Sequence, residues 1–117
     1  MADVRKAIQQ VVRAGLAATY HADLTTTDTF LVRNNGHVIL HFKKTGAGAC
    51  TVTILNPLAG GLVDGLVVTN RTISVPATTG DRFVGPFPPH VYNDANGDVR
   101  FTLSEVTGLT GAILGVD

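Results

Sequence analysis

The sequence predicts an all-β protein: an antiparallel, jelly-roll-like sandwich of about eight strands, preceded by one short amphipathic helix. From residue 28 onward, segments of alternating apolar and polar residues follow one another. Turn signals separate them at the spacing of about 8–12 residues that is typical of sandwiches and barrels. No helical pattern lies between these segments, so a parallel α/β sheet is not expected. The 117 residues suffice for one domain with one core.

The expected helix spans residues 3–15, so we divide the chain into an N-terminal helical arm, 1–15, and a sandwich domain, 16–117. Asp3 is a suitable N-cap, and Gly15 can adopt the left-handed conformation that ends a helix. A helix of this length is marginal alone in water, so its apolar side must be buried on its own domain or on a partner subunit. The apolar residues at helical spacing are Val4, Ala7, Ile8, Val11 and Val12.

The strands are expected between the turn signals that follow. Asn34-Asn35-Gly36 indicates a hairpin-type turn, and residues 56–65, which have no clear period, indicate a loop. The predicted strands span residues 29–33, 37–44, 49–55, 66–68, 72–75, 82–84, 98–104 and 109–116, with a further short piece at 91–92. Alternation places the following side chains in the core: Val38, Leu40, Phe42, Cys50, Val52, Ile54, Val99, Phe101 and Leu103.

The composition argues against several classes of protein. Charged residues make up only 15% of the chain, which favours a surface partly covered by neighbours, and the formal net charge is zero. No global basic field is present to hold nucleic acid, and no apolar run is long enough to span a membrane. Cys50, the only cysteine, can form neither an intrachain disulfide nor a CxxC metal site. It fits synthesis in a reducing cytoplasm, and Sec-type secretion is not expected, because the first residues do not show the charged-then-apolar pattern of a leader.

No catalytic, cofactor-binding or metal site is expected, and the protein is not expected to be an enzyme. His37 and His41 share a strand face about 13 Å apart, too far to bind one zinc ion together. Residues 93–98 resemble a calcium loop superficially, but the distal glutamate and flanking helices are missing, and a turn explains them. Neither serine lies in a GxSxG elbow.

The segment at residues 85–92 is the most distinctive in the chain, because three prolines stiffen it. Phe87 and Tyr92 either plug the open end of the sandwich or present an apolar patch to a partner subunit. Together with the helix, this segment supplies the candidate interface residues: Val4, Ile8, Val11, Val12, Pro86, Phe87, Pro88, Pro89 and Tyr92.

Several stretches carry a resemblance to a known class of proteins. They read VRNNG at 32–36, HFKKTGAGACTVT at 41–53, VPATTGDRFVGPFP at 75–88, YND at 92–94 and VRFTLSEVT at 99–107. Together, over about residues 16–116, they resemble small virion structural proteins of tailed bacteriophages, especially phages of actinobacteria. The N-terminal helix is the least familiar part.

The resemblance implies a capsid decoration (cement) protein that stabilises the shell of the major capsid protein. It implies a virion protein made in the host bacterial cytoplasm and a homo-oligomer with a trimer favoured, whereas the expectation of no nucleic-acid or membrane partner comes from the composition. Low charge and apolar loop tips suit a neck or tail component equally well. A further alternative is a carbohydrate-binding module for host attachment, for which the aromatic candidates are Tyr20, Tyr92 and Phe87.

Overall fold

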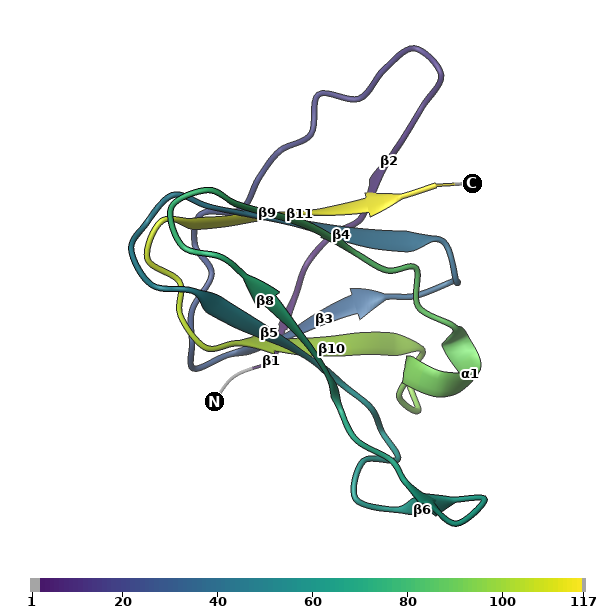
Figure 1. The fold of residues 1–117 in the computed structure, drawn as a ribbon. Coiled ribbons are helices and arrows are strands. Elements are labelled where there is room, and N and C mark those ends of the chain that lie inside the picture. Colours follow the sequence, from purple (N-terminus) through teal and green to yellow (C-terminus); the bar gives the residue numbers. More distant parts are fainter. Residues whose placement is uncertain (1–2, 117) are drawn as a thin grey trace.

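The computed structural model describes residues 3–116, apart from the Val63 side chain, and it shows two β-sheets packed face to face as a sandwich (Figure 1). The five-stranded sheet has the order β1 (Asp3–Arg5), β3 (Thr29–Arg33), β10 (Asp98–Leu103), β5 (Cys50–Leu55) and β8 (Arg71–Val75). The four-stranded sheet has the order β2 (Gln9–Gln10), β11 (Leu109–Gly115), β4 (Val38–Lys44) and β9 (Gly80–Val84). A separate hairpin, β6 (Leu62–Val63) and β7 (Leu66–Val67), and a short helix, α1 (Pro89–Tyr92), complete the described chain.

The strands pair in a nested order along the chain. β5 pairs with β8, β4 with β9, and β3 with β10, all antiparallel. Outside them, β2 pairs with β11 in parallel, and His21 forms an antiparallel bridge to Gly111. Most connections therefore cross from one sheet to the other. The expected hairpin turn at residues 34–36 is such a crossing, because β3 and β4 belong to different sheets.

The predicted alternation is confirmed in the core. Every residue that the pattern placed inward on the strands at 37–44, 49–55 and 98–104 is buried. Phe101 of β10 lies at the centre, with ring centroids 5.3 Å from Phe30 of β3 and 5.8 Å from Phe42 of β4. Cys50 is buried as a small core residue.

The two ends of the sandwich are closed differently. At the Val38 end of β4, the Phe87 side chain is 3% exposed and belongs to the core cluster. At the other end, Lys44 is buried, donates a hydrogen bond to the Thr107 carbonyl and lies 3.6 Å from a carboxylate oxygen of Glu105. A backbone hydrogen bond from Thr107 holds the pKa of Glu105 below its usual value, with a further contribution from Lys44.

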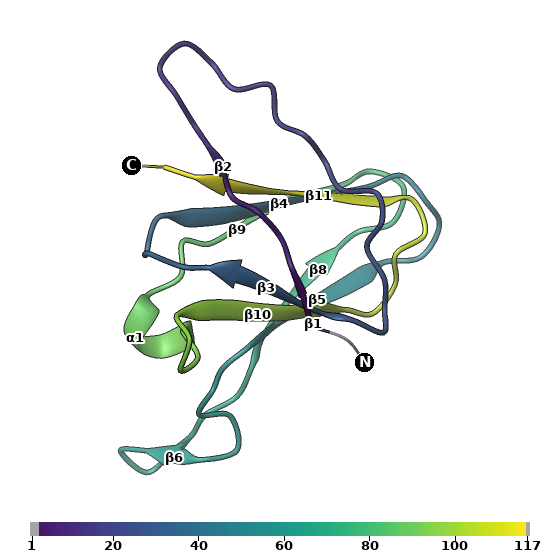
Figure 2. The ribbon, with the colours of Figure 1, turned by 180° about the vertical axis from the view of Figure 1, so that it is seen from behind.

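The predicted helix at residues 3–15 is wrong. The chain is extended there: β1 pairs in parallel with β3, and β2 pairs in parallel with β11. This segment thus passes from the edge of one sheet to the edge of the other (Figure 2). The Lys6 amide donates to the Leu31 carbonyl at 2.9 Å. A helix would satisfy its own backbone but leave these edge groups unpaired.

The other differences concern strand direction and local elements. The sandwich is mixed rather than purely antiparallel, because both N-terminal strands pair in parallel. The one helix is α1, near residue 89, and residues 56–65 belong to a projecting hairpin rather than to a loop alone.

Asp98 anchors the N-terminal segment to the sandwich. Both Arg5 guanidinium Nη atoms donate to its carboxylate at 2.8 Å, and Arg33 Nε lies 3.6 Å away. The Asp98 side chain is 1% exposed. The hydrogen bond from Arg5 lowers the pKa of Asp98 and outweighs the desolvation that raises it. A bidentate pair of this kind restricts both position and orientation.

Replacing Asp98 with asparagine should lower the free energy of unfolding by about 1.5–3 kcal/mol, because the buried carboxylate loses its charge-assisted hydrogen bonds with the half-exposed Arg5. Urea denaturation measures this change. The matched control is Asp64→Asn, at the exposed tip of the hairpin. Because the Asp98 pKa is lowered on folding, the wild-type contribution is complete above the ordinary aspartate pKa of about 3.9 and is lost as the pH falls below it. Equal, small effects of both substitutions would contradict this role.

Candidate functional site

The described part of the chain contains no assembled metal site. Within residues 3–116, no three His, Cys, Asp or Glu side chains come close enough together to hold a metal ion. No helix among these residues is long and apolar enough to cross a membrane. His41, one of the two histidines considered for zinc, is occupied by neighbouring side chains.

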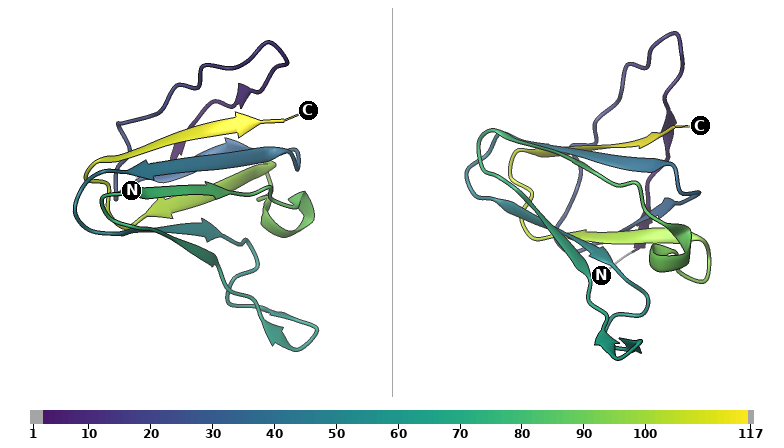
Figure 3. Two further views of the ribbon diagram at one scale, coloured as in Figure 1. Left: turned by 45° about the horizontal axis from the view of Figure 1, so that its top comes forward. Right: turned by 45° about the vertical axis from the view of Figure 1, so that its right-hand side comes forward.

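Large exposed apolar side chains gather instead on two projections. We call residues 56–70 the hairpin arm and residues 11–19 the N-terminal loop. The two extend from opposite sides of the molecule, the loop beyond the four-stranded sheet and the arm beyond the five-stranded sheet (Figures 1 and 3). Leu58, Leu62, Leu66 and Val67 are exposed on the arm, and Val11, Val12 and Leu16 on the loop.

The hairpin arm is built by a tight turn. Asp64 and Gly65, between β6 and β7, have positive φ angles of 52° and 79°, as the two central residues of a type I′ turn require. Below this turn, the Gly60 amide donates to the Val68 carbonyl and the Val68 amide to the Gly61 carbonyl, both at 2.9 Å. The arm therefore holds its shape without packing its tip on the core.

The tip of the arm is unusual in how much apolar surface it presents. Leu62, Leu66 and Val67 are 69%, 72% and 67% exposed. Asp64 is the only charged residue between 56 and 70. An isolated two-stranded hairpin is at best marginally stable in water. A clustered, nearly uncharged apolar tip is typical of a surface that a partner covers.

The N-terminal loop is closed at its base by polar contacts. The Gln9 side chain exchanges two hydrogen bonds with the Thr19 backbone, both 2.7 Å long. The adjacent Tyr20 hydroxyl lies 2.8 Å from His41 Nδ1. Lys43 Nζ lies 4.9 Å from the centre of the Tyr20 ring. These contacts fasten the base of the loop to the outer face of the four-stranded sheet.

His41 is the central residue of these contacts. Its Nε2 lies 2.5 Å from an Asp81 carboxylate oxygen, and its ring stacks on Phe83 at a centroid distance of 3.9 Å. The Tyr20 hydroxyl can donate to a neutral imidazole or accept from a protonated one, so either protonation state keeps both contacts. This Tyr20–His41–Asp81 chain is a structural connection between loop, β4 and β9.

The structure separates the predicted interface residues into three groups. Val4 and Ile8 pack against the core and are not an exposed stripe, and Phe87 is a core plug rather than part of a presented patch. Tyr92 is half-buried and contacts Phe87 edge to face. The remaining residues are exposed: Val11, Val12, Pro86, Pro88 and Pro89.

Sequence reasoning missed the hairpin arm. The sequence does contain a signal for a hairpin at this place, because Asp64-Gly65 is a dipeptide typical of hairpin turns. Two apolar pairs flank this dipeptide, Leu62-Val63 and Leu66-Val67. The pairs are only two residues long, so they show no strand alternation. Of the carbohydrate candidates, Tyr20 contacts His41, Phe87 is 3% exposed, and Tyr92 is half-buried and lines a surface cavity at the base of the hairpin arm.

No protein-family model, curated protein or solved structure matches this chain.

Phe87→Ala should destabilise the isolated protein by about 3–5 kcal/mol, because it leaves a cavity in the core. Phe83→Ala is the matched control: Phe83 is 66% exposed, and its loss should cost less than about 1 kcal/mol. Thermal unfolding of the two variants measures the difference. An unchanged melting temperature for Phe87→Ala would show that this side chain is not a core plug.

Proposed function

We propose that this chain is a bacteriophage virion structural protein, a capsid decoration (cement) protein that binds and stabilises the shell of the major capsid protein. The observation that carries the proposal is the concentration of exposed apolar side chains on two projections of an otherwise well-packed sandwich. The resemblance of residues 16–116 to small phage virion proteins supports the same assignment.

The nested strand order supports the jelly-roll component of this proposal. Pairing β2 with β11, β3 with β10, β4 with β9 and β5 with β8, in two alternating sheets, follows the order of a double-sheet jelly roll. Domains of that architecture include viral capsid and lectin domains. By analogy of fold, this architecture supports a structural role without assigning a partner.

The energetics favour the hairpin arm as the main attachment point. Burying one leucine or valine side chain contributes about 1.5–3 kcal/mol before the costs of association. Leu62, Leu66 and Val67 already stand apart from the core, so a partner can cover them without disturbing the sandwich. The type I′ turn restricts the backbone at the tip, which lowers the ordering cost of binding.

The arrangement of the projections fits a protein that joins neighbours. A protein with apolar surfaces on opposite sides can contact two partners at once, such as a capsid subunit and a second copy of itself. We propose a homo-oligomer on the capsid, with a trimer favoured because the resemblance to phage decoration proteins implies one. A neck or tail ring would use the same surfaces, and copy number distinguishes the two.

The proposal predicts that particles assembled with Leu62→Ser/Leu66→Ser lose most of this protein, whereas the variant unfolds at the wild-type temperature. Val116→Ser is the control, because Val116 is exposed but lies outside both projections. Quantitative mass spectrometry of purified virions measures the copies per particle. Absence of the wild-type protein from virions, or full retention of the double variant, would contradict the proposal.

A further inference from the structure

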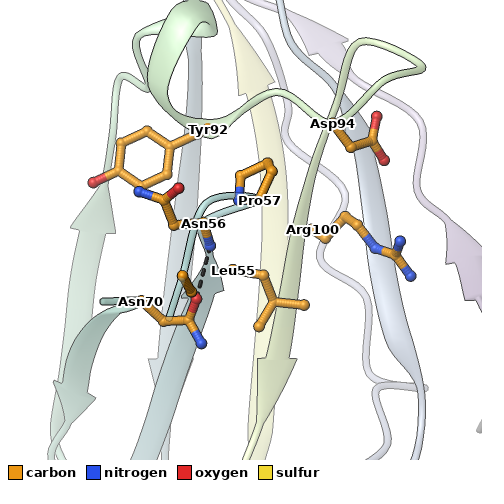
Figure 4. A pocket seen from close by; sticks show the side chains of 8 residues that line it. Leu55, Asn56, Pro57, Asn70, Tyr92, Asp94 and Arg100 are labelled. Atoms are coloured by element: carbon orange, nitrogen blue, oxygen red, sulfur yellow. Dashed lines mark hydrogen bonds between the residues drawn. The ribbon is translucent and has the colours of Figure 1, made fainter. Parts of the chain in front are cut away.

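A cavity of about 320 Å³ lies where the base of the hairpin arm meets α1 and β10 (Figure 4). Its volume is at the lower end of the range of about 300–1,000 Å³ for small-molecule sites. In this view Tyr92, Asn56 and Asn70 lie on one side of Leu55 and Pro57, and Asp94 and Arg100 lie on the other. The cavity therefore combines an apolar floor, an aromatic ring and polar groups on two walls.

The polar groups of one wall are held in place by the chain and keep unused donors. The Asn56 Oδ1 accepts from the Leu58 amide at 2.9 Å, and the Asn70 Oδ1 accepts from the Asn56 amide at 2.8 Å. Because both side-chain oxygens are used locally, the two Nδ2 groups remain as donors. The Tyr92 oxygen accepts from Arg71 Nε at 3.0 Å, so its own hydrogen is also free to donate.

The opposite wall offers a carboxylate acceptor. One oxygen of Asp94 accepts from the Asn96 and Asp98 amides at 2.8 and 3.0 Å, and the carboxylate has a second oxygen. On the same wall, the Arg100 guanidinium donates through Nη2 to Asp3 Oδ1 at 3.0 Å, so its own ion pair holds this side chain in place.

We propose that this cavity binds one pyranose unit of an uncharged carbohydrate. A sugar ring presents C–H groups that fit the Tyr92 ring and Pro57, and hydroxyls that both accept from the amides and donate to Asp94. Because Arg100 is already paired with Asp3, it offers no free positive charge to an anionic ligand, and Asp94 beside it disfavours one further. A purely apolar ligand would leave all of these polar groups without partners.

The site is separate from the attachment surface. The sugar would lie at the base of the hairpin arm, whereas the apolar side chains of Leu62, Leu66 and Val67 lie at its tip. The inference therefore does not rest on the proposed structural role, and either can fail without the other.

Saturation-transfer NMR on the full chain tests this site, with glucose, galactose, mannose and N-acetylglucosamine as probes. Sialic acid is the anionic comparison, and an unlabelled proline-rich peptide is the peptide comparison. The decisive variant is Asn70→Asp, which keeps the Oδ1 that accepts from the Asn56 amide but removes the Nδ2 donor. Asn56→Asp does the same at the neighbouring position. Each should weaken binding of a neutral sugar at least tenfold.

The control is Asn35→Asp, whose side-chain oxygen also accepts a backbone amide, that of His37, but lies outside the cavity. It should bind sugar as the wild type does, and all three variants should melt near the wild-type temperature. Three results would overturn the inference. These are no saturation transfer to any neutral sugar, equal sugar binding by the Asn70→Asp and Asn35→Asp variants, and preferential binding of sialic acid or the peptide.

Discussion

The contact of Phe101 with Phe30 and Phe42 is the interaction on which the sandwich depends. Phe101 and Phe30 belong to the five-stranded sheet and Phe42 to the four-stranded sheet, so the three rings join the two layers. With a single cysteine, the chain has no disulfide to support this packing. Phe87 closes one end of the core and the Lys44 side chain closes the other. The projections can remain outside because the core is complete without them.

The N-terminal segment shows where sequence patterns stop being sufficient. Apolar residues at positions 4 and 8 satisfy helical spacing, but the same spacing arises when an extended chain contacts the core on its way between two sheet edges. The edge strands are too short to show alternation, and their partners, β3 and β11, are distant in sequence. The Arg5–Asp98 pair, which joins residues 93 positions apart, has no local signal. The strands from residue 29 onward were predictable because their alternation is local.

The candidate surfaces were predictable only in part. The Pro-rich segment was recognised as distinctive, but whether Phe87 faced inward depended on the tertiary position of β4 and α1. Lys44 was not predicted to be buried, because its Thr107 and Glu105 partners are distant in sequence. The Asp-Gly turn of the hairpin arm is recognisable in the sequence, but the exposure of the arm's apolar side chains could be seen only in the structure. The cavity at the base of the hairpin arm is lined by residues from four separate segments of the chain.

A rigid sandwich that attaches through the tip of its hairpin arm is the central claim. Electron cryomicroscopy of wild-type particles tests it most directly, because the map gives the position, copy number and orientation of the protein together. The account predicts sandwich density on the capsid, with residues 62–67 buried against a neighbouring subunit. A map in which the sandwich is present but the arm extends into solvent would contradict it, as would a shell without such density.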